Sequence, residues 1–110
     1  MLAQLNRLTS HDDFARVTKS TIKASTRALV GYLLIEPEIT TPKVGFIVSR
    51  AVGGSVTRHR VTRQLRHAVR DSIGLLPTSS MVVIRALRKE QNPKREIPEL
   101  LNSLSKRVAK

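Results

Sequence analysis

The sequence predicts an α+β fold in which helices pack on one small mixed sheet, in the order helix, strands, helix, strand, helix. Three observations predict it. Residues 27–37, 43–52 and 80–87 are short runs rich in Val, Ile and Leu, which is typical of strands. Residues 57–73 repeat apolar side chains with a helical period, and so does the end of the chain. A chain of 110 residues is long enough for one modest core, so we expect a single domain over residues 1–110.

The first helix is expected in the segment SHDDFARVTKS. Ser10 can cap this helix, and the negative charges of Asp12 and Asp13 are favourable near the positive N-terminal end of the helix dipole. Phe14 and Val17 lie three residues apart and share a face. The segment KSTIKASTR, which overlaps the end of this helix, is a candidate for an additional strand.

Two strong strands come next. Pro37 ends the strand over residues 27–37, and the strand over residues 43–52 runs into a glycine turn. A helix and the strand at 80–87 follow. Residues 43–87 therefore form a strand–helix–strand crossover, whose two strands could be parallel neighbours.

The central helix is expected over about residues 57–73. Gly53 and Gly54 supply the turn before it, and Ser55 or Thr57 can cap it. The last helix begins at about Lys94 or Ile97, and Pro98 is tolerable in its first turn. The apolar stripe of the last helix consists of Ile97, Leu100, Leu101, Leu104 and Val108.

Charge is the outlying property of the composition. The chain has 20 Lys and Arg against 8 Asp and Glu, a net charge of +12. Such an excess concentrates polyanions near the surface, so we expect a nucleic acid as partner, with an anionic membrane as second candidate. There are no cysteines, and no apolar run reaches membrane-spanning length. The first residues do not resemble a signal peptide, so we expect a soluble cytoplasmic protein.

The central helix carries most of the local charge. On a helical wheel, Val61, Leu65 and Val69 gather on one side. The opposite side is a nearly uniform cationic face, formed by His59, Arg60, Arg63, Arg66, His67 and Arg70. Arg58 falls outside that arc but sits in the first turn, where it can reach a ligand together with the glycine turn.

An ordinary solvated helix face mixes charges of both signs, because like charges repel. Here no acid occurs from Ile39 through Arg70. Five arginines and no lysine occupy residues 58–70, and guanidinium groups bind phosphate in bidentate fashion. This favours RNA or DNA over a lipid surface. Phe14 and Tyr32 could stack on a single strand or pack in the core, whereas core packing is favoured for Phe46.

No catalytic constellation is present. His11, His59 and His67 have no zinc-like spacing, Glu36 and Glu38 make a weak metal site, and the nucleophile and phosphate-loop motifs are absent. We expect a polyanion binder without catalytic residues or a metal site of its own.

At this point the residues match a known family. The segment KVGFIVSRAVGGSVTRHRVTRQLRHAVR resembles the signature region of the bacterial ribonuclease P protein subunit. The flanking segments NRLTSHDDFARV, RALVGYLL and SMVVIRAL are similar too, so the resemblance covers the chain from about Asn6 to Val108.

The resemblance implies an α+β fold whose strand–helix–strand crossover is left-handed. It implies a protein subunit that binds a catalytic RNA and the single-stranded 5′ leader of precursor tRNA. The RNA, with Mg²⁺ bound mainly by it, would cleave the precursor endonucleolytically to give the mature 5′ end. The holoenzyme would thus be the endoribonuclease, and the protein would be a monomer apart from its RNA, with neither membrane nor DNA as partner.

The resemblance also implies site residues. Arg58, His59 and Arg60 match an Arg-Asn-Arg triplet. Arg63 and Arg66 match the basic positions that follow, and Arg50 matches a basic residue at the end of the strand. Together with Arg70 these are the expected RNA-binding residues. Phe14 and Tyr32 match aromatic residues that line the leader cleft. Four positions depart from the family pattern: Thr18 replaces a second cleft aromatic, Thr62 replaces a common basic residue, and Gly54 and His59 each stand where Asn is usual.

Two other classes of protein remain open on the sequence. One is a structural RNA-binding protein of ribosomal type, which reconstitution of cleavage would separate from a ribonuclease P subunit. The other is a DNA-binding regulator that reads bases with residues 57–73; such a regulator usually has a dimer interface, and no spare apolar patch is evident for one.

Overall fold

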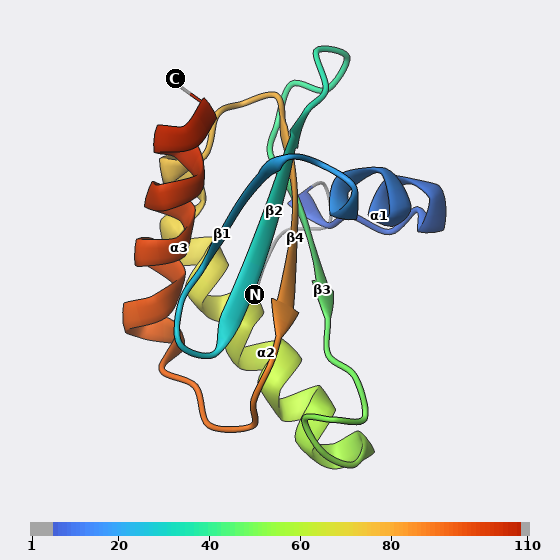
Figure 1. The fold of residues 1–110 in the computed structure, drawn as a ribbon, viewed down its shortest axis with the longest axis vertical. Helices are drawn as coiled ribbons and strands as arrows, with labels where there is room; N and C mark the ends of the chain where they lie inside the picture. The colour runs from blue at the N-terminus through green and yellow to red at the C-terminus, as the bar shows by residue number, and fades with distance from the viewer. Residues whose placement is uncertain (1–5, 109–110) are drawn as a thin grey trace.

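The computed structural model describes residues 6–108, which form three α-helices, a short 3-10 helix and a four-stranded sheet (Figure 1). The elements are α1 (His11–Thr18), β1 (Ile22–Ser25), β2 (Leu29–Ile35), β3 (Lys43–Ile47), α2 (Ser55–Ser72), η2 (Ile73–Leu75), β4 (Ser80–Ala86) and α3 (Pro93–Val108). The α+β class and the element order are confirmed, and the segment KSTIKASTR does contain a strand, β1.

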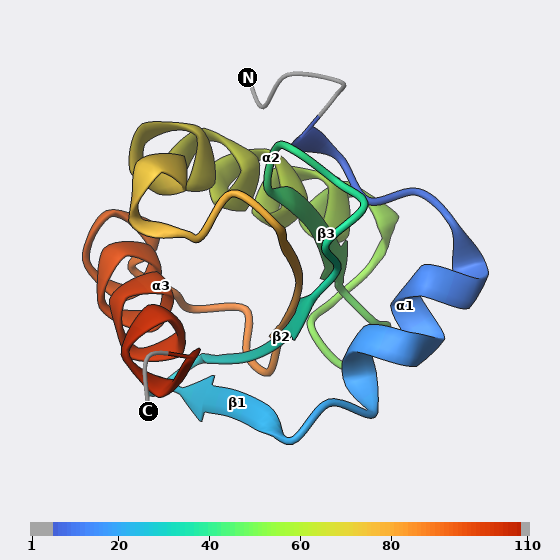
Figure 2. The ribbon, with the colours of Figure 1, turned by 90° about the horizontal axis from the view of Figure 1, so that it is seen from above.

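The sheet has the strand order β1-β2-β4-β3. β2 pairs antiparallel with β1 and β4, whereas β3 and β4 are parallel neighbours, as predicted. In Figure 1 both parallel strands run downward with β3 to the right of β4, and α2 lies behind the sheet. Figure 2 shows α2 on that same side from above. The connection is therefore left-handed, against the usual right-handed rule for such crossovers.

Side chains alternate between the two faces of the sheet, and each face has its own apolar cluster. α2 and α3 cover one face, where Leu29, Leu33, Val82 and Ile84 meet apolar residues of both helices. α1 covers part of the other face with a smaller cluster, made of Leu8, Val17, Met81 and Val83. Phe46 is half-buried and packs against the larger cluster, so its predicted core role is confirmed.

β3 ends at Ile47, so the predicted strand over residues 43–52 is five residues too long. The chain turns instead, because Val52 donates its N–H to the carbonyl of Ser49 and Gly53 donates to that of Arg50. Gly53 has φ of 154°, a backbone conformation that favours glycine. Arg50 consequently lies in this turn and not at the strand end, where the resemblance had placed it.

Two helix starts also differ from the prediction. α2 begins at Ser55, with Gly54 as its N-cap and no side-chain capping bond, so capping by Ser55 or Thr57 was wrong. α3 begins at Pro93, earlier than either predicted start, because proline suits the first position of a helix. Pro98 therefore lies in the second turn. At α1 the prediction is confirmed, since the Ser10 hydroxyl accepts the Asp13 N–H at 3.4 Å.

Candidate nucleic-acid interface

The cationic face of α2 points away from the core. Val61, Leu65 and Val69 are buried against the sheet and α3, which fixes the rotation of the helix. The opposite side therefore reaches solvent: His59, Arg60, Arg63, His67 and Arg70 are exposed, and Arg66 is half-buried. The structure thus brings the predicted members of this face together along one helix.

Counter-charges are nearly absent from this face. Within residues 6–108, Arg70 is the one arginine of the predicted RNA-binding set with a carboxylate partner, since its Nε lies 3.4 Å from Oδ1 of Asp71. Both side chains are about half or more exposed, so the pair contributes little. Arg60, Arg63 and Arg66 form no ion pair in the described part of the chain. Their charge is available to an external polyanion.

Arg58 sits at the N-terminal end of α2, off the cationic face. It is half-buried, and its Nε is buried without a hydrogen-bond partner among the described residues. Together with Ser55, His59 and Thr62 it lines a shallow hollow of about 170 Å³. The first turn of α2 contains no acid. The positive end of the helix dipole is therefore uncompensated beside this hollow, which suits a phosphate.

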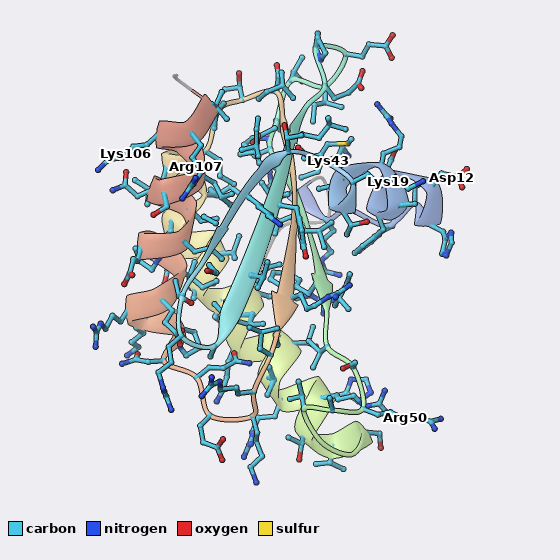
Figure 3. All side chains as sticks on the ribbon, viewed as in Figure 1. Asp12, Lys19, Lys43, Arg50, Lys106 and Arg107 are labelled. Atoms are coloured by element: carbon cyan, nitrogen blue, oxygen red, sulfur yellow. The ribbon has the colours of Figure 1, made fainter. Side chains whose placement is uncertain are left out.

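Arg50 extends the same basic surface onto the turn before α2. Its side chain projects outward from that turn, close to the start of the helix (Figure 3). Val52, which is 3 % exposed, anchors the turn in the core. Arg50 is thereby held beside the start of α2 although it precedes the helix.

A second candidate surface lies on the α1 face of the sheet. Residues directly opposite each other in neighbouring strands share a face. The register places Lys23, Tyr32, Val83 and Gly45 in one row across all four strands. The ring of Phe14 lies directly over Gly45. The two predicted cleft aromatics, Phe14 and Tyr32, are both half-buried and belong to the same apolar cluster.

Phe14 depends on the absence of a side chain at position 45. A Cβ added to Gly45 would lie 2.3 Å from Cζ of Phe14. We expect Gly45→Ala to displace the ring and to lower the free energy of unfolding by about 1–2 kcal/mol. Urea unfolding followed by circular dichroism measures this. Gly74→Ala is the matched control, because an added Cβ there meets no atom within 4 Å. Equal stability of the two variants would show that Phe14 is not seated on Gly45.

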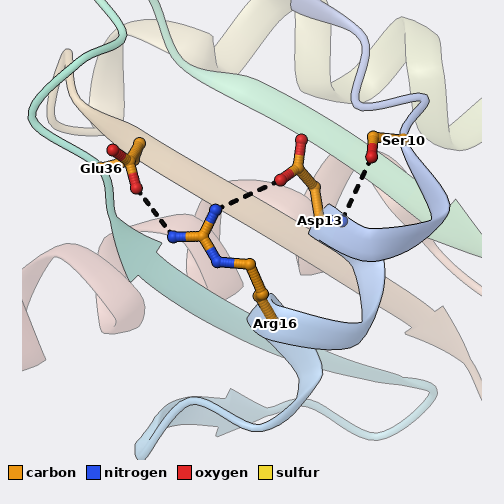
Figure 4. Close-up of polar contacts among 4 residues, drawn as sticks. All are labelled: Ser10, Asp13, Arg16 and Glu36. Atoms are coloured by element: carbon orange, nitrogen blue, oxygen red, sulfur yellow. Dashed lines mark hydrogen bonds and ion pairs between the residues drawn. The ribbon is translucent and has the colours of Figure 1, made fainter.

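α1 is held against the sheet by an ion pair as well as by its apolar face (Figure 4). Nη2 of Arg16 lies 2.8 Å from Oε2 of Glu36, in the loop after β2, and Nη1 lies 3.3 Å from Asp13. The hydrogen bond to Glu36 raises the pKa of Arg16 above its ordinary value. This contact joins α1 to the β2–β3 loop.

Two basic residues on this face were missed in the sequence. Arg85 is the one exposed residue of β4 and lies between Val30 and Ile47 in the register. Lys23 lies opposite Tyr32. A lone arginine in the apolar run SMVVIRAL was a signal for Arg85, whereas nothing in the sequence marked Lys23.

Thr18 contributes no aromatic surface to the predicted leader cleft. Its hydroxyl donates to the backbone carbonyls of Phe14 and Ala15, at 3.0 and 3.1 Å. At this position the chain has a hydroxyl engaged with its own helix, where the family pattern has an aromatic ring. The aromatic rings that the described residues place on this face are therefore those of Phe14 and Tyr32.

Metal ligands do not gather in the part of the chain that the structure describes. Over residues 6–108 there is no group of three or more His, Asp or Glu side chains that could hold a metal ion. None of the described helices is long and apolar enough to cross a membrane.

Comparison with known proteins decides the family. The model of the family Ribonuclease P matches residues 2–109 of the chain. The chain belongs to the ribonuclease P protein family. The ribonuclease P protein component of Streptomyces griseus is 43 % identical over 95 residues, which cover 79 % of this chain and 77 % of that protein. The one from Nocardioides sp. is 40 % identical over 94 residues, covering 84 % and 80 %.

Solved ribonuclease P proteins share the fold. The Staphylococcus aureus protein superposes with a TM-score of 0.74 at 22 % identity and covers 96 % of this chain and 95 % of its own. The Thermotoga maritima protein gives 0.73 at 21 % identity, covering 92 % and 96 %. The prediction of a ribonuclease P protein subunit with an RNA partner is confirmed, and a ribosomal-type protein is not better supported. The individual RNA-binding and leader-binding residues stay predictions.

Proposed function

We propose that this ribonuclease P protein binds the catalytic RNA of the holoenzyme through the cationic face of α2, together with Arg50 and Arg58. The observation that carries the proposal is that Arg60, Arg63 and Arg66 on α2 have no carboxylate partner within residues 6–108. Guanidinium groups bind phosphates in bidentate fashion. Because these arginines are not engaged in an ion pair, none has to be broken before a phosphate binds. A nearly uniform Arg and His face suits phosphate geometry more than base edges, so it favours folded RNA over a sequence-read DNA site.

The α1 face of the sheet holds the 5′ leader of precursor tRNA in this proposal. Phe14 and Tyr32 offer aromatic surface to unpaired bases, and Arg85 supplies a positive charge between them and the β3–α2 turn. The two surfaces are separate, so one protein can contact the catalytic RNA and the leader together.

Cleavage itself belongs to the RNA partner in this proposal. Mg²⁺ supplies metal-ion catalysis there, and the described part of the protein has no ligand cluster that would fit the ion. We assign no catalytic step to a protein residue. The protein acts in the cytoplasm as a monomer apart from RNA, and its contribution is binding and orientation of the substrate.

Reconstitution tests the proposed function. The protein is added to the catalytic RNA and precursor tRNA at low Mg²⁺, where phosphate repulsion is poorly screened. We expect cleavage to be rescued by the protein and no cleavage by the protein alone. If cleavage by the RNA is unchanged when the protein is added, the proposed function is wrong.

A further inference from the structure

A groove lies beyond Tyr32, at the outer edge of the sheet. It has a volume of about 530 Å³, and Thr21, Lys23, Ser25 and Tyr32 line it on the sheet side. Arg107, near the end of α3, also lines it. No acidic residue lines this groove. Neither cation has an ion-pair partner among residues 6–108, so the groove presents two free positive charges.

The groove continues the proposed leader surface. Tyr32 belongs to both, and Lys23 lies directly opposite Tyr32 in the β1–β2 register. The row from Gly45 under Phe14 to Lys23 crosses three strand spacings, on the order of 14 Å. A single-stranded leader that stacks on Phe14 and Tyr32 therefore points at Lys23 when it continues toward the outer edge of the sheet.

The chemistry of the groove fits the backbone of a single strand more than a base. Lysine and arginine bind phosphates, and the hydroxyls of Thr21 and Ser25 can donate to phosphate oxygens. Beyond Tyr32 the groove has no second aromatic ring on which a base could stack. β1 is an edge strand, so unpaired backbone N–H groups along its outer side add further donors.

We propose that this groove binds phosphates of the upstream part of the 5′ leader, with Lys23 and Arg107 as the contacts. The proposal rests on the proposed function, because it extends the path of the leader past Tyr32. The proposal makes the end of α3 part of the substrate site. Because only a long leader reaches the groove, the affinity for precursor tRNA then depends on leader length.

The test uses the reconstituted holoenzyme and precursor tRNAs whose leaders are lengthened one nucleotide at a time. The affinity of the wild-type holoenzyme for precursor tRNA should rise first when the leader reaches Phe14 and Tyr32. It should rise a second time when the leader becomes long enough to reach the groove. The double variant Lys23→Ala/Arg107→Ala should lose this second rise, on the order of tenfold for two single-strand phosphate contacts near 0.15 M salt. Its affinity for the shortest leader should be unchanged, which also shows that it folds. Lys106→Ala is the matched control, because Lys106 projects from α3 away from the sheet (Figure 3).

Three outcomes overturn the inference. Retention of the second rise by the double variant shows that the groove does not hold the leader. An equal loss at every leader length shows that the groove contacts the catalytic RNA instead. If wild-type affinity does not depend on leader length at all, leader binding by the protein fails first, and the inference fails with it. Only this last outcome also contradicts the proposed function.

Discussion

Replacing Arg60 and Arg63 together by alanine is expected to lower the affinity of the protein for the catalytic RNA on the order of 30-fold near 0.15 M salt. Both side chains are exposed on the cationic face, and neither has a carboxylate partner in the described chain. Each lost phosphate contact should reduce the slope of log affinity against log salt by about 0.9. Titration of the RNA at several salt concentrations measures both quantities.

The control for this variant is a cation outside the proposed surfaces. Lys106→Ala changes the net charge by one and should leave the salt slope within about 0.2 of wild type, because it loses no direct contact. Since Arg60 and Arg63 are exposed and unpaired, the double variant should unfold at the wild-type temperature. An unchanged salt slope in the double variant would refute the contacts and leave only a general attraction by net charge.

Glu96→Ala is expected to lower the free energy of unfolding by about 3 kcal/mol, the largest effect we expect from one polar substitution. The Glu96 side chain joins α3 to the β1–β2 turn. Its Oε1 accepts the Thr26 hydroxyl at 2.7 Å and the Ala28 N–H at 2.9 Å, and its Oε2 accepts the Asn92 N–H at 2.8 Å. Glu96 is 6 % exposed, and its loss leaves the buried Ala28 N–H and the half-buried Thr26 hydroxyl without their acceptor, whereas Asn92 is exposed and can bond water.

The same residue predicts a pH dependence of stability. Burial raises the pKa of Glu96, but hydrogen bonds from Asn92, Thr26 and Ala28 outweigh it, and the net pKa lies below the ordinary 4.5. A carboxylate with a lowered folded pKa stabilises the fold fully above its unfolded pKa and loses that contribution as the pH falls through the folded value. Wild type should therefore lose stability below about pH 4.5 relative to Glu96→Gln, whose side chain does not titrate.

Urea unfolding at a series of pH values measures both effects of Glu96. Glu99→Ala is the matched control, because Glu99 lies on the same helix and is exposed. It should change stability by less than about 0.5 kcal/mol. A stability difference between wild type and Glu96→Gln that stays constant from neutral to acid pH would contradict the assigned role.

Local patterns predicted most of the fold. The cap at Ser10, the period of the central helix and the apolar strand runs each depend on residues that are neighbours in the chain. The errors occurred where distant contacts decide the outcome. β3 is shorter than its apolar run because Val52 is drawn into the core by a turn. α3 starts early because Pro93 suits its first position, and Glu96 joins that first turn to the β1–β2 turn through the distant Ala28 N–H.

The sequence by itself determined the cationic face of α2, since helical period and a long stretch without acids need no knowledge of the rest of the molecule. Only the tertiary structure decided which side chains share the α1 face of the sheet. Strand order and register place Tyr32 beside Lys23, Arg85 beside Val30, and Phe14 over Gly45. The physical reason is that strand pairing joins residues that are far apart in the chain. The left-handed crossover likewise could not be expected from local chemistry, because the usual rule for such connections is right-handed.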